Sequence, residues 1–300
     1  MDTPLVHIVI INFNSSDDCI ECVESLLQMD YPNFNVYILD NLSKNEEIEK
    51  LLSWGNTQSN FSLVEASNPL PLKINSIVLL KSRENLGFGG GNNIVLNQLK
   101  NKKNEFIWLL NPDMIVSKNA LLELTGAKTG IQIQATPTYM ANSKDKMLHL
   151  GVARVKKLSA TVEFIKNSNK RFDYINGGSM FFSCELLKVL DLFPEKYFLY
   201  WEETHWCKLA RQKNVDLKIN YNVKVWDKGS TSIGKGMIAE YYYTRNGLIY
   251  RKEFEAQLLL VNILMHIFRF LLRIISMRFK RAQGIMLGLS HFIIGKTGKL

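Results

Sequence analysis

The sequence has few cysteines and no long run of Gly-X-Y or of low-complexity residues. Four cysteines among 300 residues are too few for a disulfide framework, and the 46% hydrophobic content excludes a disordered or collagen-like chain. No basic and apolar leader precedes residues 5–11. We therefore expect a protein of the reducing cytoplasm, with one large domain or two small ones.

Cys19 and Cys22 have the CxxC spacing of metal and redox sites. A zinc site would need a second ligand pair, and a redox site would need a thioredoxin-like context, and the sequence has neither. We interpret the spacing as a coincidence on a helix. No convincing Ser-His or Cys-His arrangement is present either, so the sequence gives no enzyme nucleophile.

Acidic residues are absent after Glu255, and this absence explains most of the net charge of +9. The basic residues beyond it are Arg269, Arg273, Arg278, Lys280, Arg281, Lys296 and Lys299. Because the excess is confined to an apolar C-terminal segment and not spread over the chain, it argues against a nucleic-acid partner. It favours an anionic membrane surface.

The N-terminal half alternates short apolar runs with helical segments. Residues 5–11, 34–39, 77–81 and 105–110 have the β-branched, apolar character of buried parallel strands, and residues 15–29 and 87–100 are predicted helices. The alternation predicts a doubly wound α/β fold. Residues 55–76 are predicted to be an inserted loop, short strands are expected after about residue 130, and a helix is expected over residues 202–212.

Polar residues recur where the predicted strands end: Asn12 and Asn14, Asp40, and Asp113. Ligands of open parallel sheets bind beyond the carboxyl ends of the strands, so these side chains are candidates for a binding site. Each of them alone is also a common turn or helix-cap residue. Their repetition after successive strands favours the binding site.

The segment Asn85–Asn93 contains four glycines and opens a predicted helix. Such a segment lets backbone approach a phosphate at a helix N-terminus, and Asn85, Gly87 and Asn92 are its candidate ligand-binding residues. The pattern is not GxGxxG, and it follows a late strand instead of the first one. A flexible helix start is the alternative interpretation.

Two further segments carry carboxylates in positions suited to catalysis. Asn111-Pro112-Asp113 follows an apolar strand, and a carboxylate there, together with substrate phosphates, is how Mg²⁺ or Mn²⁺ is usually held. Glu202 and Glu203 follow the aromatic residues 197–201, which can wall a dry pocket and raise the pKa of a carboxyl that acts as general base. The alternative is that both glutamates only complement a helix dipole.

Several of these segments, taken in order, resemble the family 2 glycosyltransferases, and in particular the rhamnosyltransferase-like bacterial subset. The resemblance covers nearly the whole chain. Its matching segments are residues 9–14, 38–43, 85–93, 109–113, 176–182, 198–207, 244–246 and 288–299. No single one of them is specific, but their common order makes a chance match improbable.

The resemblance implies a GT-A fold, a nucleotide-sugar donor such as a dTDP- or UDP-sugar, a divalent metal and inversion at the anomeric carbon. Asp40 corresponds to the residue that contacts the nucleotide, Asp113 to the metal-binding acid of the DxD motif, and Glu203 to the presumed base. Asn111 stands at the first position of that motif, as is common in the subset. By the same correspondence, Arg245 of Thr244-Arg245-Asn246 is assigned to donor binding.

The sequence departs from the family pattern in two places that matter for activity. Glu203 stands where an Asp is usual, and Asp227 of residues 226–230 stands where many relatives carry a metal-reaching His. Asp227 is still a ligand for a hard cation, and we assign it to the metal with Asp113. The two departures keep open the alternative of a catalytically silent, membrane-associated assembly partner.

Residues 258–275 are apolar and long enough to raise the question of a membrane span. Their polar residues fall on one helical stripe that continues to Lys280: Asn262, His266, Arg269, Arg273 and Ser276. Each arginine near the centre of a span would cost roughly 2.5–3.5 kcal/mol. We therefore expect a helix in the membrane interface with its cations on lipid headgroups. Packing on the catalytic domain or on a second copy of the chain is the alternative.

Together these features predict an α/β chain of GT-A type with a C-terminal amphipathic helical tail. Residues 1–236 are the expected catalytic domain, with a donor half of about 1–125 and an acceptor half of about 126–236, and residues 237–300 the membrane-associating region. The expected reaction transfers rhamnose or another hexose to a lipid-linked glycan acceptor in O-antigen or capsule synthesis. It would take place on the inner face of a bacterial plasma membrane.

Overall fold

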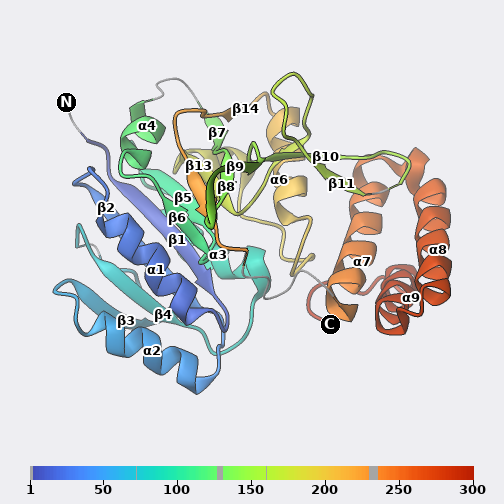
Figure 1. The fold of residues 1–300 in the computed structure, drawn as a ribbon, viewed down its shortest axis with the longest axis horizontal. Coiled ribbons are helices and arrows are strands. Elements are labelled where there is room, and N and C mark those ends of the chain that lie inside the picture. Colours follow the sequence, from blue (N-terminus) through green and yellow to red (C-terminus); the bar gives the residue numbers. More distant parts are fainter. Residues whose placement is uncertain (1–2, 72, 127–130, 160, 230–235) are drawn as a thin grey trace.

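An eight-stranded, mostly parallel sheet forms the centre of the molecule, in the order β14-β7-β13-β5-β1-β2-β4-β3 (Figure 1). The structure, a computed structural model, describes residues 3–71, 73–126, 131–159, 161–229 and 236–300. Its strands are β1 (Val6–Asn12), β2 (Phe34–Asp40), β3 (Phe61–Glu65), β4 (Ile77–Lys81), β5 (Phe106–Leu110), β7 (Gln132–Ala135), β13 (Ser179–Ser183) and β14 (Asp216–Ile219). β1 pairs in parallel with β2 and β5, whereas β13 runs antiparallel between β5 and β7.

Helices cover both faces of this sheet, as the alternation of strands and helices predicts. One face carries α1 (Ser16–Leu27), α2 (Asn45–Gly55) and α4 (Ala120–Gly126), and the other carries α3 (Gly87–Leu99), α5 (Leu186–Leu190) and α6 (Glu202–Gln212). Successive side chains of a strand point to opposite faces. Ile8 and Ile10 therefore join the core under α1, and Val9 joins the core under α3.

Two small sheets lie beside the main one. The first consists of β6 (Met114–Val116), β15 (Val225–Asp227), β8 (Thr138–Met140) and β9 (Ser143–His149). The second consists of β10 (Val152–Val155), β11 (Val162–Phe164) and β12 (Tyr174–Ile175). The first of them brings residue 227 next to residue 114, because β15 and β6 are paired.

Most of the elements predicted from the sequence are confirmed, and two predictions are wrong. The strands ending at residues 12, 40, 81 and 110 and the helices α1, α3 and α6 lie where the pattern places them. Residues 55–76 are not only a loop, because β3 pairs with β4 there. The expected helix over residues 258–280 is broken: it ends at Ile275, and a new helix begins at Phe279.

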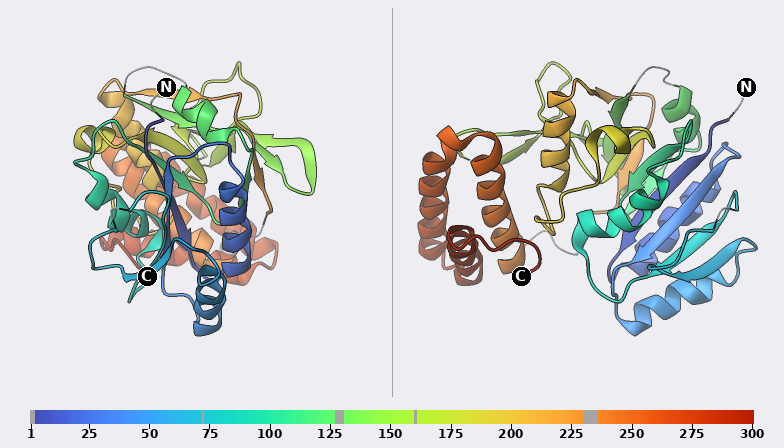
Figure 2. Two further views of the ribbon diagram at one scale, coloured as in Figure 1. Left: turned by 90° about the vertical axis from the view of Figure 1, so that its left-hand side faces the viewer. Right: turned by 180° about the vertical axis from the view of Figure 1, so that it is seen from behind.

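The C-terminal helices gather at one end of the molecule, away from β1 to β4 (Figures 1 and 2). They are α7 (Met237–Phe254), a short 3₁₀ turn (Ala256–Leu258), α8 (Leu259–Ile275) and α9 (Phe279–Ile293). Gly284 and Gly288 let α9 lie close against α7, since a Cβ atom on Gly284 would be 2.2 Å from the carbonyl oxygen of Met237. The tail therefore folds back on itself as a packed helical unit.

The polar stripe of α8 faces the protein, not the lipid side that we expected. Asn262 and His266 are fully buried, and the Asn262 side-chain amide donates to the carbonyl oxygen of Lys157 at 2.9 Å. Arg269 and Arg273 form ion pairs with Glu240 of α7. The expectation that these two cations lie on headgroups is wrong, because a buried carboxylate within the protein binds them.

The apolar side of α8 and of the α8–α9 corner is exposed instead. Large apolar side chains there that face solvent include Leu260, Leu264, Phe268, Leu271, Ile275, Met277 and Phe279. Residues 256–275 are, by length and composition, the one described helical segment apolar enough to cross a membrane, with a mean hydropathy of 2.0, and only 11% of that segment is buried. The amphipathic pattern is thus confirmed: the apolar face is exposed, while the polar face packs on the protein and not on headgroups.

Candidate active site

Asn12, Asp40 and Asn14 meet where β1 and β2 end, as predicted for the sheet edge. The Asn12 side-chain amide donates to Asp40 Oδ1 at 3.1 Å, and Asp40 Oδ2 accepts the backbone N–H of Ser43 at 3.1 Å. Asn12 and Asp40 are both fully buried. Asn14 is exposed and adopts a positive φ of 53°. Asn12 and Asp40 therefore hold the shape of this edge, and Asn14 is the member of the group that faces solvent.

A residue that the sequence did not single out, Asn41, connects this edge to the glycine segment. Its side-chain amide donates to Asn85 Oδ1 at 3.3 Å and to the carbonyl oxygen of Gly87 at 3.0 Å, while its Oδ1 accepts the backbone N–H of Leu86 at 2.8 Å. The only sequence signal for it is its place after Asp40 in a turn. Asn85 is thereby fixed beside the ends of β2 and β4.

The glycines at the start of α3 pack against other segments of the protein and do not line an open phosphate-binding loop. Gly87 has a φ of +72°, and a Cβ atom on it would lie 1.9 Å from the carbonyl oxygen of Phe198. That oxygen accepts the backbone N–H of Phe88 at 2.9 Å. Gly89 packs in the same way against Glu202. The predicted close approach is real, but the loop before α6 occupies the position that we assigned to a phosphate, and the assignment of Gly87 is corrected accordingly.

The side chain of Asn92, the last candidate of that segment, also forms its hydrogen bond within the protein. It is buried, and its side-chain amide donates to the carbonyl oxygen of Phe88 one turn earlier in α3, at 2.9 Å. A side chain that satisfies the first turn of its own helix stabilises that turn. The structure therefore gives Asn92 a structural role in place of the predicted donor contact.

Asp113 and Asp227, the two predicted metal ligands, are brought to the same place by strand pairing. Asp113 directly precedes β6, Asp227 ends β15, and the two strands are antiparallel with Asp227 opposite Met114. The backbone N–H of Lys228 donates to the carbonyl oxygen of Asp113 at 3.0 Å. Ser230, the end of the motif around Asp227, lies outside the described residues.

The chemistry of this pair fits a hard divalent cation that binds together with a substrate. Among the described residues, no three His, Cys, Asp or Glu side chains are grouped to hold a metal. Magnesium is usually held by one or two carboxylates plus substrate phosphates, so a complete protein cage is not required. Cys19 and Cys22 are buried, free thiols in α1, as expected for a coincidental spacing.

The loop before the glutamate pair is strained and tightly held. Phe198, Tyr200 and Trp201 all have positive φ values, of 69°, 64° and 79°. The side-chain amide of Asn246 donates to the carbonyl oxygens of Tyr197, Leu199 and Tyr200 at 2.8, 2.8 and 3.1 Å. Left-handed conformations of bulky residues cost about 1–3 kcal/mol each and concentrate at functional sites. α7 thus fixes the backbone that presents Glu202 and Glu203.

Arg245 belongs to the same support and does not reach a ligand-binding surface. Its side chain is fully buried. The guanidinium donates to the carbonyl oxygen of Tyr197 at 3.0 Å and to Tyr241 Oη at 2.8 Å. The assignment of Arg245 to donor binding is therefore wrong for this structure. The Thr244-Arg245-Asn246 motif acts as a brace for the loop.

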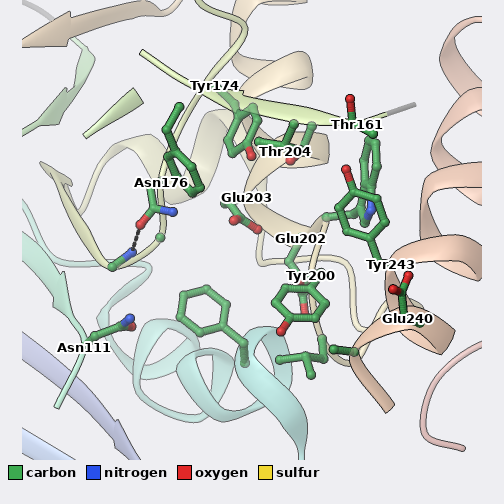
Figure 3. A pocket seen from close by; sticks show the side chains of 18 of the residues that line it. Asn111, Thr161, Tyr174, Asn176, Tyr200, Glu202, Glu203, Thr204, Glu240 and Tyr243 are labelled. Atoms are coloured by element: carbon green, nitrogen blue, oxygen red, sulfur yellow. Dashed lines mark hydrogen bonds between the residues drawn. The ribbon is translucent and has the colours of Figure 1, made fainter. Parts of the chain in front are cut away.

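A cavity of about 520 Å³ lies between the sheet edge and the C-terminal helices, and Glu203 points into its middle (Figure 3). Asn111 of the DxD-like segment lies on one side of it, and Glu240 and Tyr243 of α7 lie on the other (Figure 3). Asn176, which begins one of the family-like segments, also lines this cavity, and the residues that the sequence did not single out are Thr161, Tyr174, Glu240 and Tyr243. Nothing in the local pattern marks them, because they come from separate elements.

The two glutamates differ in their surroundings. Glu202 is fully buried against Gly89, and burial, followed by the charge of Glu203, raises its carboxyl pKa. Burial also raises the pKa of Glu203, to about 7, while nearby backbone N–H groups oppose the shift. A carboxyl with a pKa near neutrality that faces a cavity is suited to accept a proton.

The chain was compared with known proteins. Residues 4–238 match the family described as "Glycosyltransferase like family 2". The chain belongs to this family. The match ends close to the predicted boundary at residue 236, so the helical tail lies almost entirely outside it.

Similar proteins support the same family and the predicted fold. The low-salt glycan biosynthesis hexosyltransferase Agl10 of Haloferax volcanii is 24% identical over 200 residues, which cover 60% of this chain and 62% of that relative. The chain thus matches less than two thirds of the relative's length.

Among solved structures, S. aureus TarS 1–349 has a TM-score of 0.54 and 16% identity, covering 87% of this chain and 71% of that one. The mannosyltransferase PcManGT from Pyrobaculum calidifontis has a TM-score of 0.57 and 12% identity, covering 100% of this chain and 77% of that one. The predicted GT-A fold of a family 2 member is confirmed.

Proposed function

We propose that this family 2 member is an inverting glycosyltransferase that moves rhamnose or another hexose from a nucleotide-sugar donor to a lipid-linked glycan acceptor in surface polysaccharide synthesis. Two structural relatives support the donor class by their descriptions. TarS 1–349 is described in complex with UDP-GlcNAc, and PcManGT with GDP-Man and Mn²⁺. Agl10 is described as a hexosyltransferase of glycan biosynthesis. The donor nucleotide proposed for this chain is UDP or dTDP.

The observation that carries the proposal is Glu203 in the middle of the cavity. In an inverting transfer, an acceptor hydroxyl attacks the anomeric carbon from the side opposite the leaving nucleoside diphosphate, and one carboxylate takes the hydroxyl proton. Both glutamates line the cavity, but Glu202 is fully buried and packs against Gly89, whereas Glu203 is only partly buried and points into the middle of the cavity (Figure 3). We assign Glu203 as the base and Glu202 as its fully buried neighbour.

Asp113 and Asp227 are the proposed ligands of Mg²⁺ or Mn²⁺. The metal, when bound, neutralises the charge that develops on the departing diphosphate. The protein contributes two carboxylates from paired strand ends, and Asn111 occupies the cavity wall beside them. The donor therefore lies at the ends of β1, β2 and β5, and the acceptor enters from the side of the C-terminal helices.

The exposed apolar side of α8 supports a peripheral position on an anionic membrane, here the inner face of a bacterial plasma membrane. Arg278 and Lys280 flank the exposed Ile275, Met277 and Phe279 at the α8–α9 corner. Cations beside an apolar surface favour the interface of an anionic bilayer. The apolar side chains contact the acyl chains there, and the cations bind the anionic headgroups. In this proposal residues 1–236 perform the transfer, and residues 237–300 hold the enzyme on the membrane and close the acceptor side of the cavity.

Donor turnover tests the proposal against its rival, a silent assembly partner with the same fold. The full-length protein is incubated with UDP-, dTDP- and GDP-sugars and Mn²⁺, and release of the nucleoside diphosphate is measured. We expect slow hydrolysis of one donor that stops when the metal is chelated. A folded protein that binds none of these donors and hydrolyses none is instead the silent partner.

A further inference from the structure

The wall of the cavity that faces Glu203 from the C-terminal helices is a cluster of arginines around one buried carboxylate. Glu240 is only 4% exposed, and its oxygens accept Arg269 Nη2 at 2.7 Å, Arg273 Nη2 at 3.0 Å and Arg281 Nη2 at 2.6 Å. Glu240, Arg269 and Arg281 all line the same cavity as Glu203. Helices α7, α8 and α9 each contribute to this cluster, which we call the arginine wall (Glu240, Arg269, Arg273 and Arg281).

The charges of the arginine wall do not balance. Three guanidinium groups surround one carboxylate, and within the described parts of the chain no other acidic side chain is within 4 Å of any of the three. A second contact of Arg269 is to His266 Nδ1, at 3.1 Å. Burial lowers the pKa of that imidazole to about 3, so it accepts the hydrogen bond as a neutral group. The wall therefore carries an excess of two positive charges in a partly desolvated place, which is unfavourable unless an anion is bound.

The arginines are also accessible enough to bind a ligand. Their side chains are 18%, 24% and 32% exposed for Arg269, Arg273 and Arg281. The ring of Tyr243 lies under the Arg269 guanidinium, 5.3 Å from its centre, and fixes its plane. A guanidinium has five N–H donors in a rigid fork, and two such forks side by side suit the oxygens of a phosphate.

We propose that the arginine wall is a phosphate subsite for the acceptor, a deepening that rests on the function proposed above. The ligand class is a sugar joined through a phosphate or diphosphate to an apolar chain. Its anion binds Arg269 and Arg281, its sugar hydroxyl reaches Glu203 in the same cavity, and its chain leaves along the exposed apolar residues of α8 and α9. A neutral glycan would supply no anion to balance the excess positive charge of the arginine wall.

The donor diphosphate is a less suitable anion for this wall. Of the candidate donor residues, Asn111 lines this cavity on the side opposite Glu240, whereas Asp40, Asn85 and Asp113 do not line it. The phosphate and the hydroxyl that faces Glu203 would share one cavity of about 520 Å³, an ordinary volume for a single small ligand. It follows that the glycosylated hydroxyl belongs to a sugar near the phosphate, and that the reaction which supplies this acceptor is the attachment of a first sugar to a lipid phosphate.

Binding of decyl phosphate to the full-length protein tests the proposal without any turnover. Decyl β-glucoside, which has a similar chain and no charge, is the matched ligand control, and UDP with Mn²⁺ reports on the donor site. We expect wild type to bind decyl phosphate well above decyl glucoside. Arg281→Gln should weaken decyl phosphate binding at least tenfold and leave UDP binding unchanged, and Arg281→Lys should restore part of it.

Two further variants distinguish binding at a phosphate subsite from general electrostatic attraction and from misfolding. Lys280→Gln removes the same charge from the neighbouring, exposed position of α9 and should have no effect. Glu240→Gln removes the competing carboxylate and should tighten decyl phosphate binding, whereas simple damage to the fold would weaken it.

Three results would overturn the assignment. Equal losses in Arg281→Gln and Lys280→Gln would indicate only general electrostatic attraction of the anion to the basic tail. A loss of UDP binding in Arg281→Gln would assign the wall to the donor. Wild type that binds UDP but not decyl phosphate would refute the subsite and leave the proposed transferase function standing, while absence of donor binding and turnover would refute that function itself.

Discussion

Gly87 and Phe198 are in backbone contact: a methyl group on Gly87 would lie 1.9 Å from the carbonyl oxygen of Phe198. The contact joins the start of α3 to the strained loop that presents Glu202 and Glu203. It explains why a glycine with a positive φ stands at this position, since any side chain would push the loop away. The glycine segment serves the catalytic base by holding its loop.

Gly87→Ala should therefore lower both stability and activity. We expect a loss of at least about 1–3 kcal/mol from the left-handed backbone alone, in addition to the displaced loop. Urea denaturation measures the first effect and product formation the second. Gly126→Ala, in α4, is the control, because no atom of the described residues lies within 4 Å of a Cβ atom there. Equal effects of the two substitutions would contradict the role of the contact.

Glu203→Gln keeps the shape of the side chain and removes its ability to take a proton. Turnover should fall about 10²- to 10⁴-fold, while the affinity for UDP stays close to that of wild type. The wild-type rate should rise with pH through about 7, because the carboxyl must lose its proton to act as a base. Steady-state kinetics over pH 5–9 measures both. If Glu202→Gln is the inactive variant and Glu203→Gln is not, the two glutamates have the opposite roles.

The same raised pKa makes a prediction about stability. Burial raises the pKa of Glu203 from 4.5 to about 7, so between these pH values the folded protein holds a proton that the unfolded chain has released. The stabilisation that this proton gives the folded state is complete below pH 4.5 and is lost as pH rises to 7. The free energy of unfolding falls with pH wherever the folded state binds more protons than the unfolded chain. The free energy of unfolding of wild type should decline over this window more than that of Glu203→Gln. A larger decline in the variant would contradict the shift.

The metal site should depend on both strand ends. Asp113→Asn and Asp227→Asn should each remove most Mn²⁺-dependent binding of UDP, because a cation bound by one or two carboxylates loses much of its charge compensation with either of them. Isothermal titration with and without Mn²⁺ measures this. Asp145→Asn, an exposed acid of β9, is the control. Asp227→His should retain metal binding, and full metal-dependent UDP affinity in Asp113→Asn would exclude Asp113 as a ligand.

Membrane docking by α8 is best tested by substitution. Removal of everything after Glu255 would leave Glu240 buried without its three arginines, and breaking a buried ion pair costs about 3–5 kcal/mol. Leu264→Gln with Phe268→Gln changes only exposed side chains and should abolish flotation with anionic vesicles while the melting temperature is kept. Leu63→Gln, equally apolar and 51% exposed on β3 at the other end of the molecule, should float normally. A lost dimer with unchanged flotation would show that a second copy covers this face.

The parallel sheet and the sheet-edge residues could be predicted from the sequence because strand ends and periodicity are local signals. Asn12, Asp40 and Asn85 are adjacent in the structure since neighbouring parallel strands end at one edge. β3 was missed because residues 61–65 lie at the outer edge of the sheet and carry mixed polar residues. The periodicity of α8 was correct, but period alone does not say which face is buried.

The roles of Arg245 and the glycines could not be predicted, because they depend on contacts between distant segments. A hydrogen bond joins Arg245 in α7 to Tyr197 before α6, and no local sequence pattern predicts it. The arginine wall was hidden for the same reason. Its residues Arg269, Arg273 and Arg281 were assigned to lipid from composition, and the buried partner Glu240 is a single acid whose burial only the packing of three helices produces.

The pairing of β15 with β6 also determines when the proposed metal site can form during synthesis of the protein. The strand that carries Asp227 completes a sheet begun at Met114, so the predicted metal edge does not exist until the ribosome has released both. Strands β1 to β4 pair with one another over shorter separations and can assemble earlier, because contacts between close segments form before distant ones. A nascent chain can thus form the β1 to β4 part of the sheet early, whereas β13, β14 and the proposed metal site are added only when the chain has been made as far as β15.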